Sequence, residues 1–241
     1  MTTTDGRDGA QLRTPFDLFD LTGRVAIVTG GLGQLGRQYC RTLAGAGARV
    51  AALDLRADDE AVARAFPDLV GSETCPFGVS ADVTDRATWQ HRNTPWALTS
   101  KTRCQVFGGA MAEAGRGSIV NVASIYGQVS PDQSLYQYRR DRGEQFYKPV
   151  AYSASKSALY NLTRYLATYW GRSGVRVNTV TLAGVFNNQD PEFLAEYEPR
   201  VPLGRMADES DYNGVILFLA SEASRYVTGS NLTADGGWTA W

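Results

Sequence analysis

Histidine and cysteine are scarce in this 241-residue sequence, which contains one histidine, His91, and three cysteines. A single histidine excludes multi-histidine metal sites, and a Ser-His-Asp triad would have to use it. The cysteines Cys40, Cys75 and Cys104 are odd in number and lie far apart without a Cys-x-x-Cys pair. This pattern predicts a reduced, cytoplasmic protein rather than a disulfide or zinc framework.

Excess charge and long apolar runs are also lacking. The formal net charge is −1, so we expect no nucleic-acid partner and no attraction to an anionic membrane. No apolar run reaches the length of a membrane span. Residues 1–14 are polar and are predicted to be a disordered N-terminal tail rather than a signal peptide. Residues 15–241, in a chain that is 43% hydrophobic, are predicted to form one domain.

Strand-like and helix-like patterns alternate along the rest of the chain. Strands are predicted at residues 24–29, 49–54, 76–82, 117–124, 175–180 and 231–234. Helices are predicted from the end of the Gly30–Gly36 segment to about Ala46, and at about residues 57–66, 152–170 and 209–220. This alternation predicts an α/β fold with a parallel sheet that helices cover on both faces.

A glycine-rich turn follows the first predicted strand. Residues 29–36 read Thr-Gly-Gly-Leu-Gly-Gln-Leu-Gly, and a predicted helix begins within them. Gly31, Gly33 and Gly36 would permit a tight turn, a close approach of a pyrophosphate, and close packing of helix on sheet. The pyrophosphate would lie at the helix N-terminus, where N–H groups and the dipole favour anions. An ordinary tight turn would explain the glycines alone, but the flanking strand and helix favour dinucleotide binding.

An acidic residue, Asp54, ends the second predicted strand. A carboxylate there can accept hydrogen bonds from a ribose 2′-hydroxyl and would repel a 2′-phosphate. The sequence therefore favours NAD(H) over NADP(H), although Arg37 and Arg56 are near enough to weaken the preference. The alternative is a solvated acid at the end of a strand.

Tyr152 and Lys156 lie four residues apart in a predicted helix, so both side chains would project from one face. An ammonium favours the ionised form of a neighbouring phenol. Such a tyrosine can give or take a proton at a carbonyl or an alcohol. The spacing also occurs by chance on many helices, so the pair gains its weight from the glycine turn and Asp54.

Together these motifs resemble the single-domain branch of the short-chain dehydrogenase/reductase family. The matching motifs occur in family order at residues 29–36, 82–84, 117–124, 152–156, 176–178 and 235–237. The resemblance covers about residues 20–90 and 104–241, and implies a Rossmann-like, doubly wound parallel sheet. It also implies NAD(P)-dependent hydride transfer between a secondary alcohol and a ketone. Residues 186–190 and the C-terminal segment are similar to members from bacterial surface-sugar and flagellin-glycan clusters around nonulosonic acids.

The resemblance assigns roles to individual residues. Tyr152 would be the general acid/base, Lys156 would support it and hold the nicotinamide ribose, and Ser124 would hydrogen-bond the substrate oxygen. Ser124 could instead be satisfied by the backbone at the end of its strand. The implied cofactor-binding residues, besides Tyr152 and Lys156, are Gly30, Gly31, Leu32, Gly33, Gly36, Asp54, Asp82 and Val83 (at the adenine), and Val185 (at the carboxamide). A homodimer or homotetramer is also implied.

One stretch departs from the family pattern. After Asp82 a member normally continues with a helix and a strand that ends in Asn-Asn-Ala-Gly, whereas residues 85–103 are polar and irregular. The fold is therefore predicted to lack one central βα unit, as if by an internal deletion around residues 83–103. Either the strand at 117–124 pairs directly with the strand at 24–29, or a gap remains between them. A catalytically impaired NAD-binding or scaffolding relative, or the product of a damaged gene, is then the alternative function.

An insertion at residues 130–149 separates Ser124 from Tyr152. It contains aromatic and arginine side chains, namely Tyr136, Tyr138, Arg139, Arg140, Arg142, Phe146 and Tyr147. Guanidinium groups bind carboxylates and phosphates in a bidentate fork, so a small-molecule substrate is expected, with an anionic sugar as one candidate. A solvated loop is the alternative interpretation of the same residues.

Overall fold

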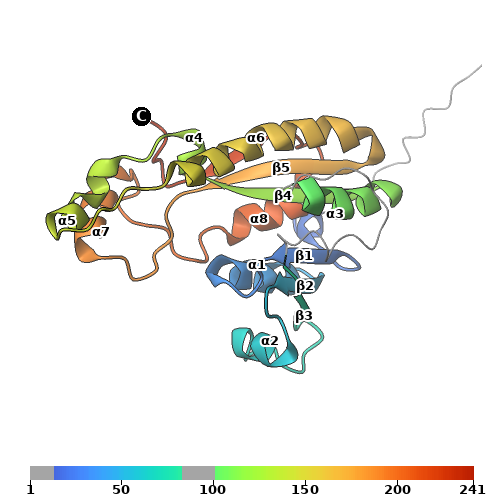
Figure 1. The fold of residues 1–241 in the computed structure, drawn as a ribbon. Helices are drawn as coiled ribbons and strands as arrows, with labels where there is room; N and C mark the ends of the chain where they lie inside the picture. The colour runs from blue at the N-terminus through green and yellow to red at the C-terminus, as the bar shows by residue number, and fades with distance from the viewer. Residues whose placement is uncertain (1–13, 83–100) are drawn as a thin grey trace, which may run out of the picture.

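The computed structural model describes residues 14–82 and 101–241, and shows two parallel three-stranded sheets in one α/β domain (Figure 1). The first sheet has the order β1 (Val25–Thr29), β2 (Arg49–Asp54), β3 (Phe77–Ser80). The second has the order β4 (Gly117–Ser124), β5 (Val175–Leu182), β6 (Asn231–Ala234). The predicted tail at 1–14 lies outside the described residues except for Thr14.

Helices connect and cover the strands. The α-helices are α1 (Gln34–Gly45), α2 (Asp59–Ala65), α3 (Lys101–Glu113), α4 (Ile125–Gln128), α5 (Gln137–Asp141), α6 (Val150–Trp170), α7 (Pro191–Tyr197) and α8 (Asn213–Ala220). Short 3-10 helices span Asp17–Phe19, Gln133–Tyr136, Gly171–Ser173, Glu198–Arg200 and Glu222–Ser224. Helices α6 and α8 lie on opposite faces of β4 and β5 (Figure 1), which confirms the predicted two-sided cover. None of the helices described is long and apolar enough to cross a membrane.

The predicted helix at 209–220 begins four residues late, at Asn213. The preceding residues form a turn around Asp211, whose carboxylate accepts hydrogen bonds from the Arg205 guanidinium at 2.6 Å and the Asp208 amide at 2.8 Å. Side-chain bonds of this kind compete with the helix ladder. By contrast, β2, β4 and β6 have the predicted bounds.

A gap separates the two sheets. Within the described ranges no hydrogen-bonded strand pair joins β1 to β4, so the second of the two expected arrangements is the one observed. A cavity of about 1250 Å³ lies between these strands and is also lined by Phe107 and Met111 of α3. On β1, Val25 is 63% exposed and Ile27 is 40% exposed. A central parallel strand normally buries such side chains, and none of the described strands other than β2 pairs with β1.

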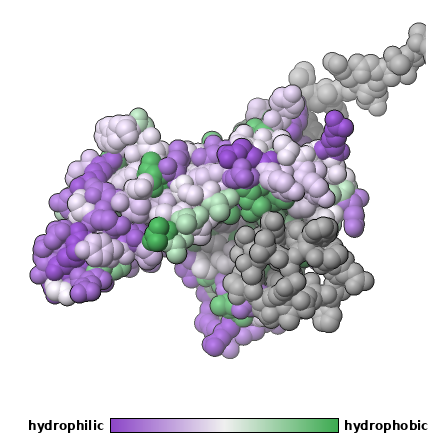
Figure 2. All heavy atoms as spheres, turned by 45° about the horizontal axis from the view of Figure 1, so that its top comes forward, coloured by the Kyte–Doolittle hydropathy of each residue, from purple (hydrophilic) through white to green (hydrophobic). Residues whose placement is uncertain are grey.

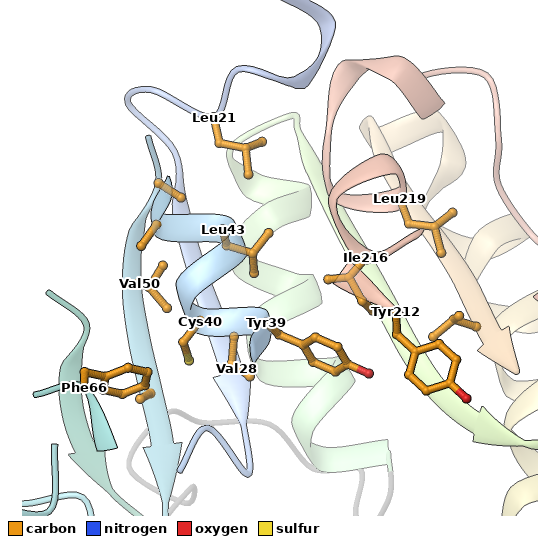
Figure 3. Packing of buried hydrophobic residues seen from close by; sticks show 14 of the residues in the cluster. Leu21, Val28, Tyr39, Cys40, Leu43, Val50, Phe66, Tyr212, Ile216 and Leu219 are labelled. Carbon is orange, nitrogen blue, oxygen red and sulfur yellow. The ribbon is translucent and has the colours of Figure 1, made fainter. Parts of the chain in front are cut away.

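An apolar core nevertheless joins the two halves of the molecule. Figure 3 shows Tyr39 and Leu43 of α1 packed near Ile216 and Leu219 at α8. The same cluster includes Val50 of β2 and Val180 and Leu182 of β5, which lie in different sheets. Full burial of a Leu or Ile side chain contributes about 1.5–3 kcal/mol. Helix packing therefore holds together two sheets that the described strands do not connect.

Candidate active site

The turn after β1 packs so closely against its surroundings that only glycine fits at Gly31 and Gly36. Gly30 has φ +71°, and Gly33 is the N-cap residue of α1, without a side-chain cap. A Cβ on Gly36 would lie 2.0 Å from the Gly30 carbonyl oxygen, and a Cβ on Gly31 would lie 2.8 Å from Ala52 Cα. The glycines thus let α1 pack closely on the turn and on β2, and the N-terminus of α1 beside this turn fits a dinucleotide pyrophosphate.

Asp54 lies beside this turn, at the carboxyl end of β2. Its carboxylate accepts hydrogen bonds from the backbone amides of Leu32, at 3.1 Å, and Leu55, at 2.8 Å. The bond to Leu32 ties the acid to the glycine turn across 22 residues of sequence. An ionised carboxylate has about four acceptor positions, so both bonds leave capacity for ribose hydroxyls.

Asp82 follows β3 on the same edge of the first sheet. The strand register pairs Asp54 with Ser80, two residues before Asp82. The structure therefore brings the glycine turn, Asp54 and Asp82 to one edge, as the motif order predicts. Val83, the other predicted adenine contact, lies outside the described residues.

Ser124 ends β4 and begins α4. It is 8% exposed, and its hydroxyl oxygen accepts a hydrogen bond from the Tyr126 amide at 3.3 Å. The backbone bond considered above is therefore present, but a serine hydroxyl also carries a donor hydrogen. Ser124 lines a cavity of about 570 Å³ together with Tyr152 and Lys156, so the three predicted catalytic residues meet at one place.

Tyr152 and Lys156 lie in the first turns of α6. The Tyr152 amide donates to the Pro149 carbonyl at 3.1 Å, and the Tyr152 side chain is 37% exposed. Lys156 Nζ donates to the Val122 carbonyl of β4 at 2.9 Å and lies 5.9 Å from the centre of the Tyr152 ring. The helix thus presents both side chains on one face, with the ammonium held between the tyrosine and β4.

Val185 follows β5 and lines the same cavity. Its carbonyl accepts a hydrogen bond from Gln189 Nε2 at 2.8 Å. The next carbonyl, of Phe186, accepts one at 2.8 Å from Gln34 Nε2 in the first turn of α1. Gln34 therefore ties the dinucleotide turn to the loop of Val185, a link between distant segments that the sequence did not reveal.

The insertion at 130–149 is not a solvated loop. It forms a 3-10 helix and α5, and buries Leu135 and Tyr136 against Phe193, Tyr197 and Met206. We call residues 130–149 the arm. Figure 2 shows the outer surface of this arm, at the end that carries α5 and α7 in Figure 1, as mostly hydrophilic. Its inner, aromatic side forms a wall of the cavity that Ser124, Tyr152 and Lys156 line.

The arginines of the insertion mainly hold the insertion itself in place. Arg142 pairs with Asp190, at 2.8 Å, and with Glu192. Arg140 donates to the carbonyls of Gln133, at 2.8 Å, and Phe146, at 3.2 Å. Of the three arginines only Arg139 lines the cavity, and its guanidinium lies 3.9 Å from the centre of the Phe146 ring and pairs with Glu144.

Two residues that line the cavity, Tyr126 and Lys148, belong to none of the sequence motifs. Lys148 Nζ lies 4.9 Å from the centre of the Tyr152 ring and 5.8 Å from that of Tyr126. Burial lowers the pKa of Lys148 and raises that of Tyr126. The available signal was proximity in sequence, because Tyr126 follows Ser124 by two residues and Lys148 precedes Tyr152 by four.

The fold and site define an NAD(P)-binding oxidoreductase with a Rossmann-like domain. A family model described as short chain dehydrogenase matches residues 24–93, and one described as enoyl-(acyl carrier protein) reductase matches residues 97–239. The chain belongs to the short-chain dehydrogenase/reductase family.

Curated relatives cover nearly the whole chain. It is 32% identical to galactitol 2-dehydrogenase (L-tagatose-forming) of Cereibacter sphaeroides, over 93% of this chain and 98% of the relative. It is also 32% identical to D-threitol dehydrogenase of Mycolicibacterium smegmatis, over 95% of this chain and 97% of the relative. Both relatives are polyol dehydrogenases by name.

Solved structures agree with the fold. A putative NAD(P)-dependent gluconate 5-dehydrogenase from Beutenbergia cavernae with bound NADP superposes with a TM-score of 0.74 at 30% identity, over 93% of this chain and 100% of that one. A short-chain dehydrogenase from Leptospira borgpetersenii with bound NAD+ superposes with a TM-score of 0.76 at 27% identity, over 95% and 97%. Because one holds NADP and the other NAD+, these structures leave the coenzyme preference to the residues of this chain.

Proposed function

We propose that this protein is an NAD(H)-dependent oxidoreductase that interconverts a secondary alcohol and a ketone on a sugar-like substrate. The observation that carries the proposal is the single cavity lined by Ser124, Tyr152 and Lys156. The similarity to a galactitol and a threitol dehydrogenase supports a polyol or sugar as substrate.

In the direction of oxidation, Tyr152 takes the proton of the substrate hydroxyl while Ser124 donates a hydrogen bond to the same oxygen. Lys156 places a positive charge 5.9 Å from the centre of the Tyr152 ring, beside the residue that takes this proton. In reduction, Tyr152 returns a proton to the developing alkoxide. The bound nicotinamide supplies the hydride acceptor or donor.

The cavity walls suit a polyol. One wall is aromatic and includes Tyr136, Phe193 and Tyr197, against which the C–H face of a carbon chain can pack. Besides Lys156, two further cations, Arg139 and Lys148, line the same space and favour a substrate with an acidic group. A nonulosonic-type acid is the narrower form of this substrate proposal.

A substrate screen tests the proposed function. With NAD+ and a panel of alditols, aldonates and sialic-type acids, we expect NADH absorbance to appear with at least one substrate, at a kcat of about 1–10³ s⁻¹. Calorimetry should first show NADH binding. No binding at millimolar NADH would overturn the proposal.

The second prediction concerns the preference for NAD+ over NADP+. We expect kcat/KM to be at least about 10-fold higher with NAD+ than with NADP+, because the Asp54 carboxylate repels a 2′-phosphate. In Asp54→Ser this ratio should fall about 10-fold or more. Asp59→Ser, which removes an exposed acid from α2, is the matched control and should keep the ratio. Wild-type protein that works better with NADP+ would contradict the role of Asp54.

A catalytically impaired NAD-binding relative is the second candidate, favoured by the gap between β1 and β4. It predicts that the protein quenches NADH fluorescence but oxidises no substrate in the screen. If the gap reflects a damaged gene, the coding region should contain an intact Asn-Asn-Ala-Gly strand in another reading frame. An unbroken frame with no such remnant would count against that origin.

We further propose a homodimer or homotetramer that associates through α6, as the family resemblance implies. Tyr165 and Tyr169 of α6 are 63% and 67% exposed and stack at 6.2 Å, and such an aromatic surface suits an interface. A monomer in light scattering would refute this assembly. No disulfide joins the cysteines of the described residues, which supports a location in the cytoplasm, and loss of activity under reducing conditions would speak against it.

A further inference from the structure

Lys148 occupies a fixed position in the wall of the catalytic cavity. Its amide donates to Gln133 Oε1 at 3.0 Å, and its carbonyl accepts from Gln133 Nε2 at 3.3 Å. One glutamine side chain thus holds the Lys148 backbone from both sides. The side chain is thereby placed against the rings of Tyr126 and Tyr152.

The ammonium of Lys148 has no anionic partner in the described part of the chain. Asp190 is the one acidic residue among those that line the cavity, and its carboxylate pairs with Arg142 at 2.8 Å. Removing an ammonium from water is costly, and two aromatic faces offset only part of that cost. The lowered pKa of Lys148 reflects the same desolvation. A half-buried cation in this position is suited to bind an anion that enters the cavity.

The neighbouring hydroxyl of Tyr126 strengthens this interpretation. Tyr126 is 7% exposed, and its hydroxyl makes no hydrogen bond to any described residue. The hydroxyl of Tyr136 is near enough to raise the pKa of Tyr126, but the two hydroxyls do not reach hydrogen-bond geometry. A polar atom without a partner beside an unpaired ammonium indicates a place for a polar ligand group.

We propose that Lys148 is a specificity-determining residue that binds the carboxylate of a sugar acid and selects such acids over neutral alditols. This rests on the proposed function, because it names the substrate class of the same site. Lys148 contacts the ring of Tyr152, so the carboxylate lies near the carbon that reacts. One ammonium matches a single negative charge. Of the other two cations that line the cavity, Arg139 is paired with Glu144, and Lys156 donates to the Val122 carbonyl at 2.9 Å. A carboxylate therefore fits better than a phosphate, which carries about two charges at neutral pH.

The experiment compares alditols with aldonates of the same configuration, such as galactitol with galactonate and threitol with threonate. Calorimetry on NADH-saturated protein gives Kd, and NAD+ reduction gives kcat/KM. In wild-type protein we expect at least one aldonate to bind about 10-fold or more tightly than its alditol. Lys148→Met should weaken binding of that aldonate about 10–100-fold and leave the alditol within about 3-fold.

Two further variants distinguish the effect of the charge of Lys148 from that of a structural change. Lys148→Arg keeps the charge and should recover part of the preference for the acid. Arg164→Met removes an exposed cation from α6, outside the cavity, and should behave as wild type. A comparison that needs no variant is wild-type binding of the aldonate against its neutral amide, where the acid should again bind about 10-fold more tightly.

Equal affinity for acid and amide, or full acid preference in Lys148→Met, would overturn the assignment. Tighter binding of the matching sugar phosphate would overturn the choice of carboxylate. If alditols are oxidised without any preference for acids, the proposed function stands and the role of Lys148 fails. If aldonate binding depends on Lys148 but no substrate is turned over, the role of Lys148 stands and the proposed function fails.

Discussion

Replacing Tyr152 by phenylalanine should lower kcat by at least about 10³-fold while changing the Kd for NADH by less than about 3-fold. Phenylalanine keeps the ring that lies 4.9 Å from Lys148 Nζ and 5.9 Å from Lys156 Nζ, so the packing of the cavity should persist. Only the hydroxyl that we propose to transfer the proton is removed. Initial rates of NAD+ reduction and calorimetric titration with NADH measure the two quantities separately.

Tyr226→Phe provides the matched control. It removes the same hydroxyl group at a position that is 100% exposed and outside both the cavity and α6. We expect its kcat to stay within about 2-fold of wild type, as for most surface substitutions. Substantial turnover by Tyr152→Phe would show that another group moves the proton.

Replacing Gly36 by alanine is expected to abolish measurable cofactor binding. The new Cβ would lie 2.0 Å from the Gly30 carbonyl oxygen and 2.8 Å from Gly31 Cα. Both contacts are with backbone, so α1 must move away from the turn that cradles the pyrophosphate. Overpacking of this kind costs about 1–3 kcal/mol of stability or more. NADH titration should show at least about a 30-fold loss of affinity, with a lower midpoint of chemical denaturation.

Gly45→Ala, at the end of the same helix, is the control for this substitution. A Cβ there meets no atom within 4 Å. Alanine favours a helix over glycine by about 0.5–1 kcal/mol, so the control should be neutral or stabilising and should bind NADH normally. Wild-type NADH affinity in Gly36→Ala would mean that the turn does not hold the cofactor.

The secondary structure was largely predictable because it depends on local pattern. The strands at 49–54, 117–124 and 231–234 have the predicted bounds. Runs of apolar residues between turn signals indicate buried parallel strands without any knowledge of their partners. The prediction of α8 was wrong only at its start, where bonds to the Asp211 carboxylate hold a turn.

The candidate site was predictable where a motif carries its own geometry. Four-residue spacing places Tyr152 and Lys156 on one helix face, and the structure places both in one cavity. The glycines also predicted close packing of the helix, and a Cβ on Gly36 would lie 2.0 Å from the Gly30 carbonyl oxygen. The arginines of the insertion were less useful for predicting an anion-binding site, because Arg140 and Arg142 bind groups within the arm and its neighbour α7.

By itself, the sequence determined the family and most of the secondary-structure elements, and it indicated the candidate site residues, because each depends on short-range spacing. Only the tertiary structure decided that β1 and β4 remain apart in the described fold, since strand pairing joins residues far apart in the chain. It also decided that Lys148, unlike the nearby arginines, has no anionic partner among the described residues. Whether a charged side chain is paired with an opposite charge depends on what packs around it. The groups around Lys148 and the arginines of the insertion come from four separate segments of the chain: the insertion, α4, α6 and α7.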